Sequence, residues 1–141
     1  IIVMITIKNE EQIQALRETG KIHAQILDSL EAMIRPGIST IDLDKEAYRL
    51  VSEAGATPSF LNYQPDHTYP KFPASLCVSV NEVVVHGIPS ESQIIKQGDL
   101  VSIDLGLQPV ISNKLFFNLF VLYNIGKPCN LEQSWALFFP S

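Results

Sequence analysis

Residues 74–89 read ASLCVSVNEVVVHGIP, and residues 98–106 read GDLVSIDLG. Three runs in and around them, 75–80, 83–86 and 100–107, are rich in β-branched and other apolar residues, which predicts three β-strands. An Asn-Glu pair separates the first two runs and predicts a hairpin turn, because Asn tolerates the left-handed backbone conformation. The stretch therefore predicts a sheet with a histidine at the end of one strand and a carboxylate inside another.

The strand predicted over 100–107 divides its side chains between two faces, because side chains alternate along a strand. The apolar face carries Val101, Ile103, Leu105 and Leu107, and the other face carries Ser102, Asp104 and Gly106. Asp104 therefore points away from the packed side. An unpaired carboxylate is costly to bury, so Asp104 needs a partner, which from the residues alone is a metal ion, a buried arginine or a set of backbone N–H groups.

Three histidines have different settings. His86 precedes Gly-Ile-Pro, where a small residue and a rigid turn leave room for a ligand, although a lone histidine at a strand end is more often structural. His23 is expected to be a half-buried packing residue of a helix, and His67 a solvated loop residue. A nucleophilic pair of Cys77 with His86 is disfavoured, because an apolar strand raises the pKa of a thiol instead of activating it.

Two helices are predicted ahead of the sheet. Asn9 opens a capping box, apolar residues then recur at steps of three and four, and the helix ends before Pro36-Gly37. Ser39 or Thr40 caps a second helix that Gly55 closes. The acidic residues in the first turn of this second helix suit the helix dipole and need no functional interpretation. The following segment, 57–73, predicts an ordered loop rich in proline and aromatic residues.

Composition limits the possible functions. The 141 residues are 46% hydrophobic with a net charge of −5, which fits one globular domain or part of one and argues against a nucleic-acid partner. The two cysteines, Cys77 and Cys129, make no disulfide framework, so a reducing compartment, the cytoplasm, is expected. The apolar stretch Leu115–Tyr123 is too short for a membrane span, and the opening 1–5 is expected to be a first strand.

Four segments carry a resemblance to a known family. They are Arg35–Thr40, Pro73–Asn81, Val85–Pro89 and Gly98–Asp104, and their order and spacing resemble type I methionine aminopeptidases over residues 5–107. The resemblance implies an α/β (α+β) chain that forms the N-terminal half of a pita-bread fold, with 1–141 as a single partial aminopeptidase domain. Residues 108–141 hold only one of the 15 acidic residues and are expected to be a divergent, truncated or frame-shifted tail.

The resemblance also implies roles for six residues. His86 would be catalytic, contacting the substrate near the scissile amide, and Asp104 would be the first metal-ligand aspartate. The wall of a pocket for the initiator methionine would be formed by Phe60, Tyr63, Phe72 and Cys77. The implied reaction is hydrolysis of the N-terminal Met peptide bond by a metal-bound hydroxide, with two divalent ions of cobalt, manganese, iron or zinc.

The chain departs from this family after the strand at 100–107. The second metal-ligand aspartate falls on Leu115, or on Asn118 if three residues are inserted, and neither suits a bridging ligand. No histidine follows His86, so Asp104 is the one evident ligand. Two hypotheses remain open: an incomplete methionine aminopeptidase that acts on peptides and nascent proteins, at the ribosome among other places, or a non-catalytic module that binds nascent chains or a partner subunit.

Overall fold

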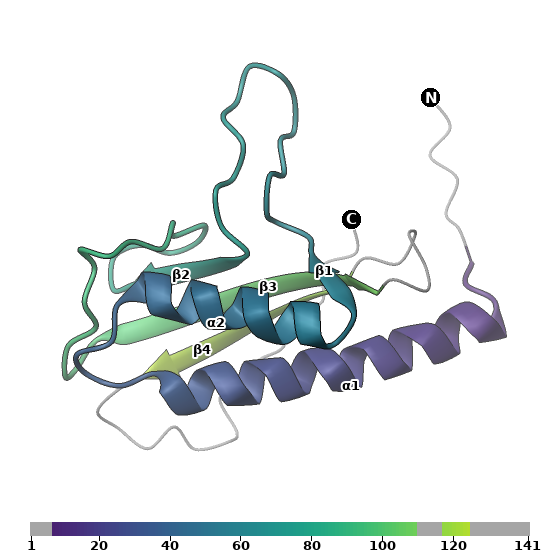
Figure 1. Cartoon of the computed structure of the whole chain (residues 1–141), viewed down its shortest axis with the longest axis horizontal. Coiled ribbons are helices and arrows are strands. Elements are labelled where there is room, and N and C mark those ends of the chain that lie inside the picture. Colours follow the sequence, from purple (N-terminus) through teal and green to yellow (C-terminus); the bar gives the residue numbers. More distant parts are fainter. Residues whose placement is uncertain (1–6, 110–116, 125–141) are drawn as a thin grey trace.

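A computed structural model describes residues 7–109 and 117–124 of the chain (Figure 1). The described residues form two helices and then four strands. The elements are α1 (Glu10–Met33), α2 (Thr40–Glu53), β1 (Ala56–Pro58), β2 (Leu76–Val80), β3 (Leu100–Pro109) and β4 (Phe117–Asn124). The strand predicted at 1–5 lies outside the described residues. Neither helix is long and apolar enough to cross a lipid bilayer within the described part of the chain.

Strand β3 is the centre of an antiparallel sheet. It pairs with β4 along one edge, while β2 and the short β1 follow one another along its other edge. In this register Cys77 lies opposite Asp104, and Ser79 lies opposite Ser102. Side chains directly opposite each other in an antiparallel pair project from the same face of the sheet. The register therefore places Cys77 and Asp104 side by side.

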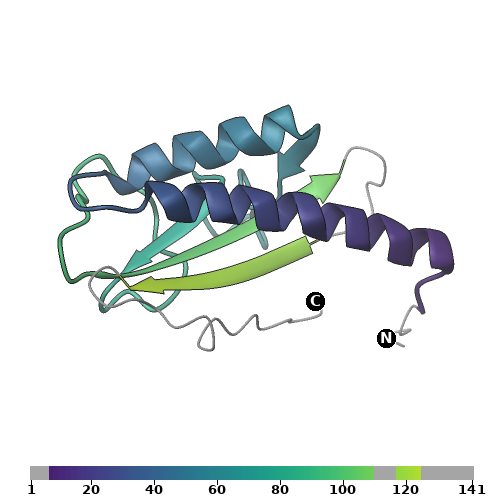
Figure 2. The ribbon, with the colours of Figure 1, turned by 90° about the horizontal axis from the view of Figure 1, so that it is seen from below.

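Both helices cover one face of this sheet (Figures 1 and 2). The core forms where the apolar side of α2 meets alternate residues of β2 and β3. Its fully buried members include Leu43, Ala47 and Val51 of α2, Leu76 and Val78 of β2, and Val101, Ile103 and Leu105 of β3. The predicted α/β class and the predicted apolar face of the 100–107 strand are confirmed. Asp104 and Cys77 belong to the other face, away from the helices.

The helix boundaries follow the predicted capping residues. The side chain of Asn9 accepts a hydrogen bond from the Gln12 backbone at 2.9 Å, and the Gln12 side chain accepts one from the Asn9 backbone at 3.0 Å. Ser39 is the N-cap of α2, and its hydroxyl accepts the Asp42 N–H at 3.3 Å. Gly55 follows α2 with φ +68°, a conformation that favours glycine. These contacts satisfy backbone groups that a helix end leaves without partners.

The predicted strand at 83–86 is wrong. Asn81 does adopt the left-handed conformation, with φ +54°, but residues 83–86 form no strand, and the segment is hydrogen-bonded to β2 at Gly87 instead. The side chains of Val84 and Val85 are 76% and 54% exposed, so they have no core to pack against. His86 has φ +57°, which is incompatible with an extended strand. The β-branched composition favours a strand locally, but a strand needs a partner along its whole length.

His23 is more deeply buried than the sequence suggests. Its side chain is fully buried, and Nε2 lies 2.7 Å from the Leu105 carbonyl oxygen. A carbonyl oxygen only accepts, so Nε2 carries the proton and donates it. Burial lowers the pKa of His23, and the hydrogen bond to Leu105 opposes this in part. A neutral imidazole therefore ties α1 to the middle of β3.

The buried His23 predicts a pH-dependent stability. Its folded-state pKa lies below the unfolded value of about 6.5, so the unfolded chain binds more protons as the pH falls below that value. His23 therefore contributes stability above about pH 6.5 that is lost toward lower pH. We expect His23→Gln to lower the free energy of unfolding by about 1–3 kcal/mol at pH 7.5. This loss should become smaller toward pH 5. Urea unfolding of the unaltered chain and of His23→Gln measures the difference in free energy of unfolding. A difference that does not change with pH would contradict the burial of a neutral imidazole.

Candidate active site

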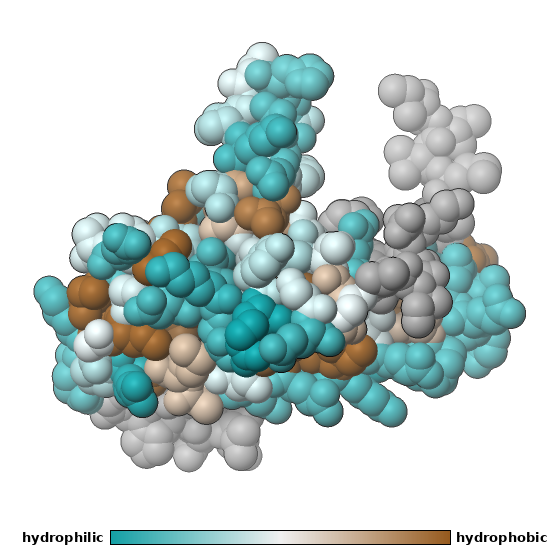
Figure 3. Space-filling model, in the orientation of Figure 1, coloured by the Kyte–Doolittle hydropathy of each residue, from teal (hydrophilic) through white to brown (hydrophobic). Residues whose placement is uncertain are grey.

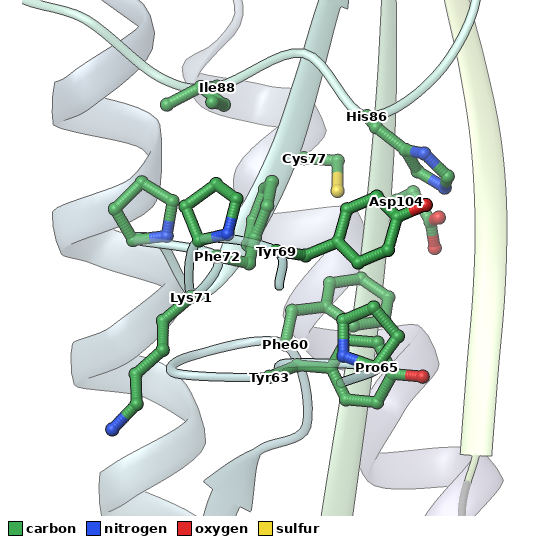
Figure 4. Close-up of a pocket in the computed structure, with 12 residues that line it drawn as sticks. Phe60, Tyr63, Pro65, Tyr69, Lys71, Phe72, Cys77, His86, Ile88 and Asp104 are labelled. Carbon is green, nitrogen blue, oxygen red and sulfur yellow. The ribbon is translucent and has the colours of Figure 1, made fainter. Parts of the chain in front are cut away.

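A cavity of about 530 Å³ opens on the face of the sheet opposite the helices (Figure 4). Its walls come from the loop between β1 and β2, from β2 and β3, and from the segment that follows β2. All six residues to which the resemblance gives a role line it: Phe60, Tyr63, Phe72, Cys77, His86 and Asp104. Residues that are 44 positions apart in the chain, from 60 to 104, thus meet in one place.

Asp104 and Cys77 form the floor of the cavity because of strand pairing. They lie opposite each other on β3 and β2, and both project from the face that the helices leave uncovered. Cys77 is 4% exposed, whereas Asp104 is partly accessible. His86 reaches the same end of the cavity from the segment after β2, and Figure 4 shows its imidazole beside the Asp104 carboxylate. His86 is exposed, so it stands at the mouth.

The aromatic wall is built by the loop between β1 and β2. The Asn62 N–H donates to the Phe72 carbonyl and the Phe72 N–H donates to the Tyr63 carbonyl, both at 2.9 Å, which joins the two arms of the loop. The rings of Phe60 and Phe72 then meet edge to face, with centroids 6.4 Å apart. Figure 3 shows that the tip of this projecting loop is hydrophilic, whereas hydrophobic surface gathers at its base. The predicted ordered aromatic loop is a wall of the cavity.

The sequence reasoning did not anticipate several lining residues. They are Pro65, Tyr69, Pro70, Lys71, Pro73 and Ile88. The signal that could have found Tyr69 and the prolines is their membership of the same aromatic loop. In Figure 4 the Lys71 amine points away from the cavity, although its backbone borders it.

The electrostatics of the floor suit a cation. Burial raises the pKa of Asp104 to about 6, and the nearby His86 lowers it in part. Burial also raises the pKa of Cys77 to about 12, with further increases from Asp104 and Asp44. The thiol is therefore protonated near neutral pH and is no nucleophile, as the sequence indicated. The carboxylate, by contrast, is short of positive charge, which a bound cation would supply.

Asp44 has a structural role that the sequence reasoning missed. Its Oδ1 accepts the backbone N–H groups of Ser75 at 2.7 Å and Leu76 at 2.8 Å, which fixes the start of β2 beside α2. Burial raises the pKa of Asp44, and these two hydrogen bonds oppose the rise. The acidic turn of α2 thus serves more than the helix dipole. Nothing in the local sequence separates Asp44 from its neighbours, because its partners are 31 and 32 residues away.

The described residues do not form a complete metal centre. They contain no group of three or more His, Cys, Asp or Glu side chains that could hold a metal ion. Asp104 is thus one carboxylate beside one imidazole, too few ligands for two ions. Leu115 lies outside the described residues. Asn118 of β4 pairs with Gly106 of β3, and Gly106 is two residues beyond Asp104 on the same strand.

Comparison with known proteins agrees with this arrangement. The model of metallopeptidase family M24 matches residues 14–109, so the chain belongs to this family. The methionine aminopeptidase of Clostridium acetobutylicum is 43% identical over 103 residues, which are 73% of this chain and 39% of that protein. The Escherichia coli enzyme is 38% identical over 125 residues, which are 88% of this chain and 44% of that protein. The chain spans about two fifths of the length of these curated relatives.

A solved structure extends the likeness to the fold. The crystal structure of methionine aminopeptidase from Thermotoga maritima matches with a TM-score of 0.77 and 31% identity, over 88% of this chain and 46% of that one. The predicted resemblance to methionine aminopeptidases, and to about half of their pita-bread fold, is confirmed. The roles of the individual residues and the boundary predicted near residue 107 stay predictions.

The protonated state of Cys77 predicts slow alkylation. At pH 7.5 a thiol with a pKa of about 12 holds far less thiolate than a thiol with the ordinary value. We expect iodoacetamide to modify Cys77 on the order of a thousandfold more slowly in the folded chain than in urea. Mass spectrometry of the peptide that contains Cys77 separates it from Cys129. Equal rates in both states would show that the thiol is not shielded.

The raised pKa of Asp104 predicts a stability cost at neutral pH. The folded chain binds more protons than the unfolded chain between about pH 4 and pH 6, so stability falls as the pH rises through this window. We expect Asp104→Asn to stabilise the chain by about 1–2 kcal/mol at pH 7.5 in the presence of EDTA, and by little at pH 4. Urea unfolding at both values measures the difference. A gain that is the same at pH 4 and pH 7.5 would refute this explanation.

Proposed function

We propose that the cavity binds the N-terminal methionine of peptides, and that the chain contributes the substrate-binding half of a methionine aminopeptidase. One observation carries the proposal: the six residues that the family resemblance singles out surround one cavity. They arrive there from β2, β3, the aromatic loop and the segment after β2. The two relatives described above, which match 73% and 88% of this chain, are methionine aminopeptidases.

The cavity wall suits a thioether side chain. Phe60, Phe72 and Cys77 present aromatic and sulfur surfaces, and methionine sulfur makes favourable contacts with aromatic rings. The volume of about 530 Å³ is within the range of small-molecule sites. Tyr63, which is 58% exposed, stands at the rim, where it can cover a bound side chain. Discrimination would come from the apolar walls, because a polar side chain would lose its hydration there without a replacement.

The polar end of the cavity would receive the substrate backbone. Asp104 is a partly buried carboxylate whose negative charge a bound cation would offset. We assign it as a ligand of the metal centre that the family resemblance implies. His86 lies beside it at the mouth, where its ring can donate a hydrogen bond to the oxygen or nitrogen of the first peptide bond. Among the described residues, Asp104 is the one carboxylate that lines the cavity, which is too few for the two divalent ions that the resemblance implies. What these residues support by themselves is binding and orientation of the substrate.

That shortage favours a second candidate function. A chain without a metal centre would hold N-terminal methionine without removing it, and so act as a binding module for nascent chains or for a partner subunit. The observation in its favour is the lack of a metal-holding group among residues 7–109 and 117–124. Both candidates need the same methionine pocket, and they differ in whether the peptide bond is cleaved.

Titration calorimetry of the whole chain tests the shared pocket. We expect Met-Ala-Ser to bind at least tenfold more tightly than Ala-Ala-Ser, because only methionine fills the apolar cavity. Phe72→Ala should weaken Met-Ala-Ser by about tenfold or more, since it removes one wall. Lys71→Ala is the matched control from the adjacent position, because its amine points away from the cavity. Equal affinity for the two peptides would overturn both candidate functions.

Release of free methionine separates the two candidates. The chain is incubated with Met-Ala-Ser and cobalt, manganese, iron or zinc in turn, and free methionine is measured by chromatography. Release that Asp104→Asn abolishes would support the aminopeptidase. Tight binding without release under every metal would support the non-catalytic module.

A further inference from the structure

The backbone at His86 adopts a conformation that its own side chain does not favour. Its φ of +57° lies in the left-handed region, which costs free energy for any residue with a Cβ. Such a conformation persists only where the surroundings hold it. The exposed side chains of Val84 and Val85 on the N-terminal side do not provide that hold. The contacts nearest to His86 that attach this segment to β2 lie on its C-terminal side, at Gly87.

Gly87 is attached to β2 at two points. The Val78 N–H donates to the Gly87 carbonyl at 2.9 Å, and the Gly87 N–H donates to the Ser79 hydroxyl at 3.1 Å. The two bonds fix both ends of the Gly87 residue against consecutive residues of the strand. Ser79 is 3% exposed, so water does not compete strongly for this contact. The segment after β2 is therefore held by one serine side chain and one strand N–H.

Close packing keeps position 87 a glycine. A Cβ there would lie 2.1 Å from the Val78 carbonyl oxygen and 2.8 Å from the Ser79 Cα. Real Cβ atoms do not approach backbone so closely, so any larger residue would lift the segment away from β2. The absence of a side chain lets Gly87 lie flat on the strand, and this sets the place where His86 must turn.

We infer that Ser79 and Gly87 are positioning residues that hold His86 over the mouth of the cavity, facing Asp104. Neither lines the cavity, so they act on a substrate through the segment that carries His86 and Ile88, both of which line it. Ser79 projects from the same face of β2 as Cys77, which places its hydroxyl beneath the segment that carries the imidazole. The inference deepens the proposed function, on which its consequence for peptide binding rests.

The neighbouring strand offers a matched control. Ser102 lies directly opposite Ser79 in the β2–β3 register, and its side chain is 5% exposed. Its hydroxyl has no hydrogen-bond partner among the described residues. Ser102→Ala therefore removes an equally buried hydroxyl from the same face without touching Gly87. Ser79→Thr keeps the accepting oxygen and serves as the conservative rescue.

The test uses nuclear magnetic resonance on the whole chain. In the unaltered protein and in Ser102→Ala, we expect the strong intraresidue amide-to-Hα cross-peak of a left-handed His86, and cross-peaks from its imidazole to the β-protons of Asp104 or Cys77. Ser79→Ala should lose both signals and weaken Met-Ala-Ser binding by about threefold to tenfold, and Ser79→Thr should restore them. Retention of the His86 signals in Ser79→Ala would overturn the inference.

A measurement on the unaltered chain guards against a variant that does not fold. The Gly87 amide should exchange its hydrogen slowly, because it is buried and donates to Ser79. Exchange at the rate of a free amide would overturn the inference without any substitution. If the unaltered chain binds no Met-Ala-Ser, the proposed function fails, while the His86 signals and Gly87 exchange still decide the positioning role.

Discussion

The antiparallel pairing of β2 with β3 is the constraint on which the rest of the structure depends. Its register puts the apolar residues of both strands under the helices and leaves Cys77 beside Asp104 on the open face. A shift by one residue would exchange the two faces, burying the carboxylate in the core and exposing the leucines. The fold and the cavity thus rely on one register, and Asp44 secures it by holding the first N–H groups of β2.

The open face carries features that stability alone would not select. A half-buried carboxylate with a raised pKa and a histidine in a left-handed conformation both cost free energy, and both lie at the same end of the cavity. Costs of this kind concentrate at functional sites, where groups are held ready for a ligand. The helix-covered face shows the opposite character, because its one deeply buried imidazole, His23, is neutral and hydrogen-bonded to β3.

Membership of family M24 gives this arrangement a chemical context. The matched residues 14–109 include the aromatic wall, Asp104 on the floor of the cavity and His86 at its mouth. The curated relatives are more than twice as long as the matched part. In the proposed function the described residues bind the substrate side chain and contribute one carboxylate toward a metal centre, and these two properties can be measured separately.

Local sequence patterns determined the helices with their caps, the strand around Asp104 and its apolar face, since each depends on residues a few positions apart. They failed at 83–86, because β-branched residues cannot reveal that no strand lies alongside them. They also missed Asp44 and Ser79, whose roles come from partners brought near by folding. Six of the cavity residues were named by the family resemblance. Their meeting in one cavity was decided by the tertiary structure, since strand register and a left-handed turn at His86 act over distances that no local pattern encodes.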